Sequence, residues 1–398
     1  MKLGILTGGG DVPPLNIVID TLRKRIVKSG DELIGFVNGW EGVVKQNCIT
    51  LNDYNNFSNI GGTFLKSSRI NLLTEENGVE TANSVLNKLG IDGLVVIGGD
   101  DTLSNAYYIK QCPCILISKT IDNDLGFIDQ KNDFIPESVV NYFTLGYPTA
   151  ADKIASFASL DEGLRTTAYS HERIIILESM GMHSGWLALA SGYGDPDFII
   201  IPEYPLDYDN FCEKLTNLYL KQKHAIVVIA EGAKFNNGKY LKADYQESDH
   251  FDNPRFGGSS FALRDLLKKD LGKYFDTRNI NAVNPSYLYR SGVPNDIDRN
   301  ISIKIGELSY EMFKNNEVMD PIFISVTIVD NEFVPKPISL SFFQQTESGR
   351  FPKRQINKGF YDENNYRLSN DGYKYFNNII DHSLINNFNK RSKDNYLY

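Results

Sequence analysis

The residues best suited to catalysis lie in the segment 119–124, which reads Lys-Thr-Ile-Asp-Asn-Asp. It follows the short apolar run 114–117, whose length and composition are typical of a buried strand. A cation, a hydroxyl and two carboxylates at the C-terminal end of a strand suit the removal of a proton from an alcohol beside a bound metal ion. Asp and Asn are also the usual residues of solvated turns, so this segment alone leaves both interpretations open.

Two glycine-rich turns that carry a carboxylate follow other apolar runs. Residues 8–11 read Gly-Gly-Gly-Asp after the run 3–6, and residues 98–102 read Gly-Gly-Asp-Asp-Thr after the run 93–97. The missing side chains let backbone N–H groups approach an anion closely, and the carboxylate of Asp100 is suited to hold Mg²⁺ beside phosphate oxygens. Each segment is also compatible with a plain tight turn or a helix N-cap.

Apolar runs alternate with segments of helical periodicity along much of the chain. The runs occupy residues 3–6, 33–37, 93–97, 114–117, 173–177, 198–201 and 225–229, and the helical segments include residues 15–27, 79–89, 103–109, 186–191 and 211–220. Strand alternating with helix predicts an α/β fold of mostly parallel sheets with helices on both faces. Ligand groups in such sheets gather at the C-terminal ends of the strands, where the motifs of this chain lie.

The composition is that of a soluble globular protein that is long enough for two domains. The chain has 398 residues, of which 41% are hydrophobic, and a net charge of −9, which argues against a nucleic-acid binder. The N-terminus lacks the apolar region of a signal peptide, and no apolar run approaches the roughly 20 residues of a membrane span. Four cysteines without zinc spacing or the density of a disulfide scaffold fit a reducing cytoplasm.

In order, spacing and wording, the segments 8–11, 61–69, 98–102 and 119–124 resemble motifs of the phosphofructokinase family; the second begins Gly-Gly-Thr and ends in Arg69. Further matches are residues 171–173, 180–181, 201–203, 231–232 and 284–291. The last of these is similar to the PSYxxRS motif of one branch of the family. The resemblance covers roughly residues 1–300. Neither a GxxxxGK[ST] phosphate loop nor a GxGxxG dinucleotide fingerprint occurs, so the common nucleotide folds lose support.

The resemblance implies a two-lobed phosphofructokinase-like fold. We expect a donor-binding lobe in residues 1–140, completed by part of residues 300–350, and a sugar-phosphate lobe in residues 141–300. Residues 350–398 are expected to form a small C-terminal extension, because the tail from about Lys353 is polar, Asn-rich and weakly periodic. A peripheral subdomain, an oligomer contact and partial disorder stay open for this tail.

The resemblance also implies roles for individual residues. Asp122 is the implied general base on the 1-hydroxyl of fructose 6-phosphate, with Thr120, Asp124 and Lys119 beside it, and Asp100 is the implied ligand of Mg²⁺. The implied donor-binding residues are Gly10, Arg69, Asp100, Asp101 and Thr102, and the implied sugar-phosphate residues are Arg173, Met180, Gly181, Met182, Glu231, Arg278, Tyr287 and Arg290. In family members the counterpart of Arg173 comes from a neighbouring subunit, which implies a homodimer or homotetramer with a shared site.

Two residues indicate the phosphoryl donor. In the family, ATP users generally have glycine where Asp101 stands and many have a small residue where Lys119 stands, whereas pyrophosphate users carry Asp and Lys. A carboxylate at Asp101 opposes the charge of a nucleotide α-phosphate, and Lys119 supplies a compact cation for a pyrophosphate oxygen. We therefore expect Mg²⁺-dependent, reversible transfer from pyrophosphate to fructose 6-phosphate, a glycolytic step, with ATP as the alternative donor.

Three positions depart from the family pattern. Met182 stands where the family has an arginine that faces the transferring phosphoryl group, and losing such a cation costs on the order of 10²-fold in rate. His183 is a candidate to compensate. Tyr287 stands where many relatives have His, and Arg278 lies further from Arg290 than usual. These departures leave open a kinase of another sugar phosphate or nucleoside-like acceptor, and a catalytically silent regulatory subunit, although intact Asp100 and Asp122 argue against the latter.

Overall fold

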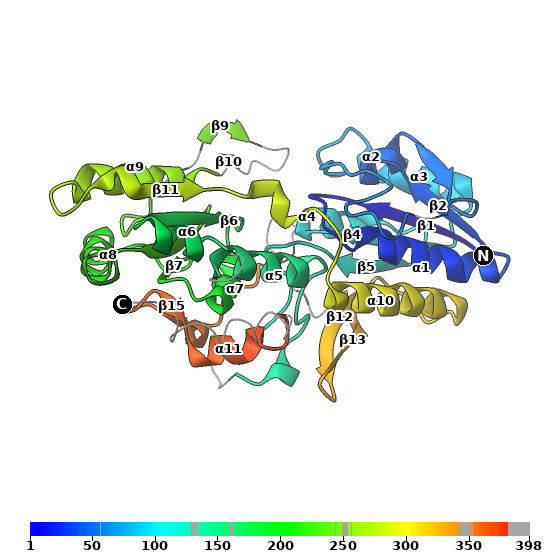
Figure 1. Cartoon of the computed structure of the whole chain (residues 1–398). Helices are drawn as coiled ribbons and strands as arrows, with labels where there is room; N and C mark the ends of the chain where they lie inside the picture. Colours follow the sequence, from blue (N-terminus) through cyan, green and yellow to red (C-terminus); the bar gives the residue numbers. More distant parts are fainter. Residues whose placement is uncertain are drawn as a thin grey trace.

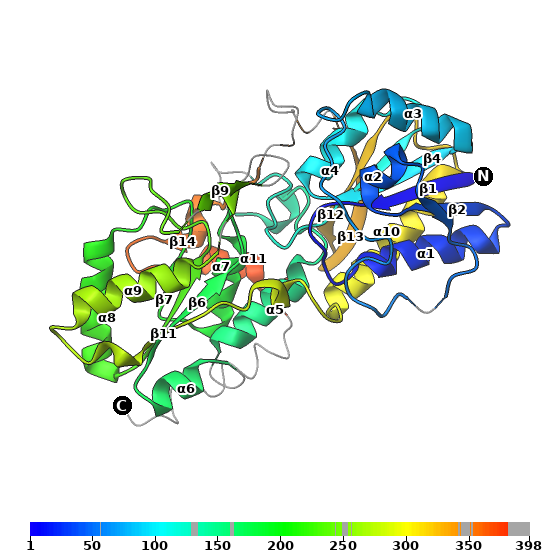
Figure 2. The same ribbon diagram turned by 90° about the horizontal axis from the view of Figure 1, so that it is seen from above.

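The computed structural model describes residues 1–55, 57–128, 134–159, 163–242, 257–340, 343, 351 and 353–380, together with the backbone of residues 244–248 and 254–255. They form two lobes that lie side by side, each built around a largely parallel sheet (Figure 1 and Figure 2). The α/β class predicted from the alternation of strand and helix is confirmed.

The sheet of the first lobe has the strand order β13-β12-β5-β4-β1-β2-β3. Its strands are β1 (Lys2–Thr7), β2 (Glu32–Phe36), β3 (Cys48–Thr50), β4 (Gly93–Gly98), β5 (Cys114–Ser118), β12 (Ile322–Val329) and β13 (Glu332–Ser339). The inner pairings are parallel, and the edge strands β3 and β13 are antiparallel to their neighbours. The late strands β12 and β13 thus join a sheet that the N-terminal residues begin.

Both faces of this sheet are apolar, which explains why helices pack on both of them. In β4, Val95 and Ile97 belong to one core cluster, and Leu94 and Val96 belong to another. Helices α1 (Leu15–Lys28) and α10 (Asp296–Lys314) pack together in the first cluster, whereas α3 (Gly78–Leu89) contributes to the second. The shorter helices of this lobe are α2 (Gly39–Val44) and α4 (Asp100–Asn105).

The second lobe is built on a parallel sheet of strand order β11-β6-β8-β7. Its strands are β6 (Ile174–Ser179), β7 (Phe198–Ile200), β8 (Ala225–Ala230) and β11 (Ile280–Val283), and its helices are α5 (Tyr147–Ala158), α6 (Arg165–Ser170), α7 (Trp186–Ala190), α8 (Tyr208–Gln222) and α9 (Ser259–Leu271). Strands β9 (Asp244–Ser248) and β10 (Pro254–Arg255) pair antiparallel in a separate two-stranded sheet. Ile175 and Leu177 of β6 lie in the same cluster as Val95 and Ile97 of β4, so one apolar core continues from lobe to lobe.

The C-terminal residues 353–380 pack into this shared core. They form β14 (Tyr361–Asp362), β15 (Arg367–Leu368) and α11 (Asn370–Phe376), drawn in orange and red in Figure 1. The Tyr375 ring stacks on Tyr142 at 4.7 Å between centroids and lies 5.0 Å from Trp186. A peripheral placement is therefore wrong for residues 353–380, because the tail's aromatic side chains fill the core from short elements that leave little periodicity in the sequence. Residues 381–398 lie outside the described part.

Side-chain contacts also fix the lobes relative to each other. The buried carboxylate of Asp298, on α10, accepts hydrogen bonds from the backbone N–H groups of Gly146 (2.8 Å) and Thr149 (3.0 Å), at the start of α5. Helix α10 packs on α1 in the first lobe, and α5 packs on α7 in the second. Among the described residues, no helix combines the length and apolar character needed to cross a bilayer.

Candidate active site

A cavity of about 370 Å³ lies between the lobes, at the C-terminal ends of β1, β4 and β5. It is lined by these predicted site residues: Gly10, Arg69, Asp100, Asp101, Thr102, Lys119, Thr120, Asp122, Asp124, Met182, Glu231 and Arg290. Gly9, Asp11, Val12, Gly99, Ile121, His183, Phe351 and Lys353 complete its wall. The fold therefore brings the ends of β1, β4 and β5 together with later segments that carry Arg290 and Lys353.

The glycine turn after β1 leaves room for cationic side chains. A methyl group at Gly10 would overlap the guanidinium of Arg290, and one at Gly9 would lie 2.9 Å from the Lys119 ammonium nitrogen. Gly9 also has a φ of 77°, a left-handed backbone conformation that side-chain-bearing residues rarely adopt. The turn thus brings two cations of other segments to the first loop of the cavity.

Lys119 is a buried lysine at the end of β5, with 3% of its surface exposed. Its ammonium group donates a hydrogen bond to the carbonyl oxygen of Gly10. Burial, followed by the positive charges of Arg290 and Arg69, lowers the pKa of Lys119 to about 7. The site therefore holds a lysine whose charge responds to an anion in the cavity.

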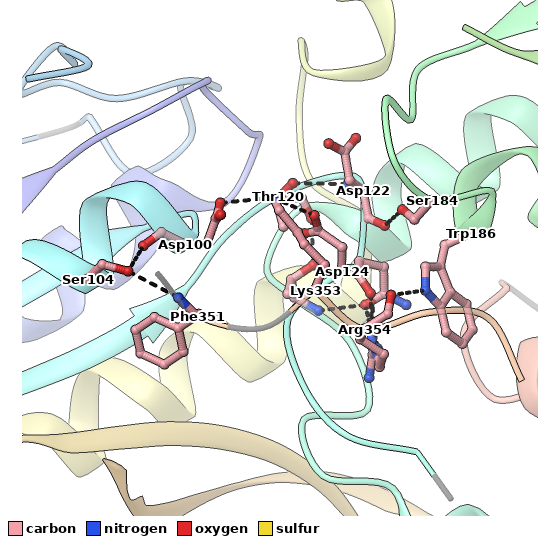
Figure 3. Close-up of polar contacts among 12 residues, drawn as sticks. Asp100, Ser104, Thr120, Asp122, Asp124, Ser184, Trp186, Phe351, Lys353 and Arg354 are labelled. Atoms are coloured by element: carbon pink, nitrogen blue, oxygen red, sulfur yellow. Dashed lines mark hydrogen bonds and ion pairs between the residues drawn. The ribbon is translucent and has the colours of Figure 1, made fainter. Parts of the chain in front are cut away.

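Asp122 lies in the loop after β5, at the wall of the cavity. The loop is fixed by its backbone: the N–H of Asp122 donates to Thr120 Oγ1 (3.1 Å), and its carbonyl accepts from Ser184 Oγ (2.8 Å). Oδ1 of Asp122 is buried and has no partner among the described residues. Figure 3 shows this carboxylate pointing away from the ion-paired groups nearby.

Burial, reinforced by the charge of Asp124, raises the pKa of Asp122, while Arg290 and Lys353 oppose the rise. A carboxylate with a raised pKa and an unoccupied oxygen at a cavity wall is suited to accept a proton from a hydroxyl group.

Lys353 joins the two loops that carry the predicted carboxylates. Its ammonium nitrogen lies 3.0 Å from Asp100 Oδ1 and 2.9 Å from Asp124 Oδ2 (Figure 3). Burial alone would lower the pKa of Lys353, but Asp124 and Asp100 raise it well above its ordinary value. Lys353 has no predicted role, because a lysine in a polar tail of weak periodicity carries no sequence signal of its own.

The same carboxylates fit Mg²⁺. Among the described residues, no cluster of three or more His, Cys, Asp or Glu side chains forms a metal site. Mg²⁺ beside phosphates, however, needs only one or two protein carboxylates. Each carboxylate pairs with Lys353 through one oxygen, Oδ1 of Asp100 and Oδ2 of Asp124, which leaves its other oxygen for a small cation.

Glu231 follows β8 on the second-lobe side of the cavity. Its Oε1 accepts a hydrogen bond from the Gly181 backbone N–H at 3.1 Å. Burial, and next the charge of Asp122, raises the pKa of Glu231 to about 7. The predicted residues Met180 and Gly181 do not line the cavity: Met180 packs against the shared core, and Gly181 supports Glu231 through its backbone N–H.

Three predicted residues lie away from this cavity. Arg173 donates to Thr167 Oγ1 at 2.8 Å within its own lobe. The Arg278 side chain is 89% exposed and pairs with Asp276, and Tyr287 is 72% exposed. The structure of one chain therefore does not bring these three residues to the predicted site.

Comparison with known proteins identifies the family of the chain. A family model described as phosphofructokinase matches residues 2–313. The chain belongs to the phosphofructokinase family. A pyrophosphate–fructose 6-phosphate 1-phosphotransferase of Dictyoglomus thermophilum is 36% identical over 346 residues, covering 85% of this chain and 93% of that relative.

Relatives with the other donor in their names are similarly close. The ATP-dependent 6-phosphofructokinase 3 of Streptomyces coelicolor is 35% identical over 325 residues, covering 80% of this chain and 89% of that protein. Among solved structures, the pyrophosphate-dependent phosphofructokinase of Marinobacter aquaeolei matches with a TM-score of 0.76 at 20% identity, covering 95% of this chain and 91% of that one. That likeness supports the phosphofructokinase fold and does not identify the phosphoryl donor.

Proposed function

We propose that this phosphofructokinase-family protein transfers a phosphoryl group from pyrophosphate to the 1-hydroxyl of fructose 6-phosphate. The observation that carries the donor assignment is that Asp101 and Lys119 both line the cavity. A carboxylate there repels the additional phosphate of a nucleotide, and a buried ammonium group meets the terminal oxygens of a short inorganic donor. Relatives named for pyrophosphate support this reading, and those named for ATP keep ATP as the second candidate.

The reaction needs a base, cations and a fixed geometry. Asp122 accepts the proton of the 1-hydroxyl group, while Lys119, Arg69 and Arg290 hold phosphate oxygens. The oxygens of Asp100 and Asp124 that do not pair with Lys353 would hold Mg²⁺, which would neutralise charge on the phosphates. Glu231, on the other lobe, is suited to accept hydrogen bonds from sugar hydroxyls.

A second copy of the chain completes the proposed sugar-phosphate site. Arg278 and Tyr287 are exposed, and Arg173 lies outside the cavity of its own chain. A homodimer or homotetramer lets a neighbouring subunit bring such an arginine to the sugar phosphate. Mixing an Arg173→Ala chain with an Asp122→Asn chain, each inactive by itself, is expected to restore activity if the site is shared; no recovery contradicts sharing.

The donor assignment is tested by steady-state assays with fructose 6-phosphate and Mg²⁺. The wild-type protein is expected to turn over with pyrophosphate, and Asp101→Gly is expected to depress that activity while raising the activity with ATP. Glu137→Gly, on the partly exposed turn Pro136–Ser138 away from the cavity, is the matched control. Turnover of the wild type with ATP and not with pyrophosphate contradicts the proposal.

A further inference from the structure

The cavity is crowded with negative charge for a phosphoryl-transfer site. Its carboxyl groups are those of Asp11, Asp100, Asp101, Asp122, Asp124 and Glu231, and its cationic side chains are Arg69, Lys119, Arg290 and Lys353. Both proposed substrates are anions, so the site depends on each cation that it has. Met182 lines the same wall and contributes no charge.

Lys353 connects the loops after β4 and β5 on the cavity wall. It pairs on one side with Asp100, which follows the donor turn after β4, and on the other with Asp124, which shares a loop with the proposed base Asp122. Its charge is also close enough to His183, the neighbour of Met182, to help lower the pKa of that imidazole, after the larger effect of burial. The Lys353 ammonium group thus lies between the donor and acceptor sides.

The residues around Lys353 are anchored. On the N-terminal side, Phe351 is buried and its N–H donates to Ser104 Oγ at 3.2 Å. On the C-terminal side, the N–H of Arg354 donates to the Asp124 carbonyl at 2.6 Å, which ties the lysine segment to the catalytic loop itself. The backbone that carries Lys353 is therefore positioned before any substrate binds.

The Arg354 side chain strengthens this anchor. Its buried guanidinium donates to the carbonyl oxygens of Asn123 (2.7 Å) and Asn141 (2.6 Å) and lies over the Trp186 ring at 4.9 Å (Figure 3). These partners are neutral, and placing a cation among neutral groups has a large desolvation cost. Its contacts instead fix the loop 119–124 and the lysine segment in one arrangement.

We propose that Lys353 supplies the cation that neutralises the transferring phosphoryl group, in place of a cationic side chain at position 182. This inference rests on the proposed function. In the step, the bond between the phosphoryl phosphorus and the bridging oxygen of pyrophosphate breaks, and a bond to the 1-hydroxyl oxygen forms. The hydroxyl proton goes to Asp122 and orthophosphate leaves. Lys353 stays protonated and contributes charge alone.

The test compares Lys353→Met with Lys336→Met, a control on the exposed part of β13, in the full-length protein. Lys353→Met is expected to lower kcat by about 10²-fold or more while the KM for fructose 6-phosphate stays within about threefold. The control is expected to match the wild type. Lys353→Arg, which keeps the charge, is expected to retain at least about a tenth of kcat.

A double variant tests whether a positive charge at position 182 can replace the one at position 353. Adding Met182→Arg to Lys353→Met is expected to regain at least about tenfold in kcat.

Binding of pyrophosphate without acceptor, measured by titration calorimetry, is expected to change by less than about fivefold in Lys353→Met, since the interaction acts mainly in the transition state. Lys353→Gln, whose amide still bonds to carboxylates, replaces Lys353→Met if the latter does not fold, with the same expected loss.

Different results would overturn the role of Lys353 and the proposed function. If Lys353→Met keeps kcat within about threefold of an active wild type, or the double variant regains nothing, the role of Lys353 is overturned. A loss of pyrophosphate binding as large as the loss of kcat also overturns it, because Lys353 would then act in ground-state binding. A wild type that turns over fructose 6-phosphate with neither donor overturns the proposed function itself.

Discussion

The segments that follow β5 and β13 each bring a lysine to the same cavity, but in opposite surroundings. Lys119 is almost fully buried, donates to a neutral carbonyl and lies near two arginines, so the pKa of its ammonium group falls to about 7. Lys353 is 34% exposed and lies between two carboxylates, so its pKa is raised. The first lysine gains its full charge from an anionic ligand, whereas the second is charged at all times.

The largest expected effect separates the two lysines by kinetics. Lys119→Met is expected to lower kcat/KM for pyrophosphate by about 10³-fold, with much of the loss in KM, because Lys119 contacts the donor before and during transfer. Steady-state kinetics at varied pyrophosphate provide the measurement. A Lys119→Met variant that loses only kcat would erase the distinction from Lys353.

The next effect concerns the anchor of the second lysine. Arg354→Met leaves the carbonyl oxygens of Asn123 and Asn141 without their donors and is expected to lower the free energy of unfolding by about 3 kcal/mol. It is also expected to lower kcat, because Lys353 is no longer held. Urea unfolding and kinetics test both, with Arg367→Met, on the exposed part of β15, as the control for losing an arginine. An Arg354→Met variant as stable and active as the wild type contradicts the anchoring role.

Replacing each lysine with methionine is expected to change the free energy of unfolding in opposite directions. Lys119→Met removes a cation whose burial is unfavourable and is expected to raise the free energy of unfolding at pH 7 by about 1 to 2 kcal/mol. Lys353→Met leaves two carboxylates without their partner and is expected to lower it by about 1 kcal/mol, a small value because solvent screens this pair. Chemical denaturation of both variants without ligands gives the comparison. Shifts of the same sign would show that the two environments are alike.

The smallest effect is a pH dependence that, of the two lysines, only Lys119 is expected to show. Since the folded-state pKa of Lys119 is about 7, the group is charged below pH 7 and loses its charge as the pH rises from 7 to 9. Binding an anion restores the charge, so the Kd for pyrophosphate is expected to rise with pH by up to about tenfold per unit, with proton uptake on binding. Calorimetry in buffers of different ionisation enthalpy measures this uptake. Lys119→Arg, which stays charged, corrects for titration of pyrophosphate itself; equal uptake in both proteins contradicts the lowered pKa.

Sequence reasoning found the first lysine and missed the second for a physical reason. Lys119 follows a buried strand directly, and parallel strands bring their C-terminal ends together whatever the rest of the chain does. Lys353 reaches the cavity only because Phe351 and Arg354 bind surfaces formed by distant residues, Ser104 and Asn123 among them. No local pattern encodes such contacts.

The other predicted residues differ in whether the geometry of a single chain determines their positions. Gly10, Asp100 and Asp122 follow glycine turns or strand ends, and all three line the cavity, because parallel strands bring their C-terminal ends together. Arg173 and Arg278 were assigned by resemblance, and their approach to a sugar phosphate depends on a second chain. Their roles remain predictions.

The central claim, that the donor is pyrophosphate, is tested most directly in the reverse direction. Fructose 1,6-bisphosphate, orthophosphate and Mg²⁺ are incubated with the wild-type protein and followed by ³¹P NMR. The proposed function predicts that pyrophosphate and fructose 6-phosphate appear together in equal amounts, and that Asp122→Asn abolishes both. Formation of ATP when ADP replaces orthophosphate, with no pyrophosphate formed from orthophosphate, would contradict it.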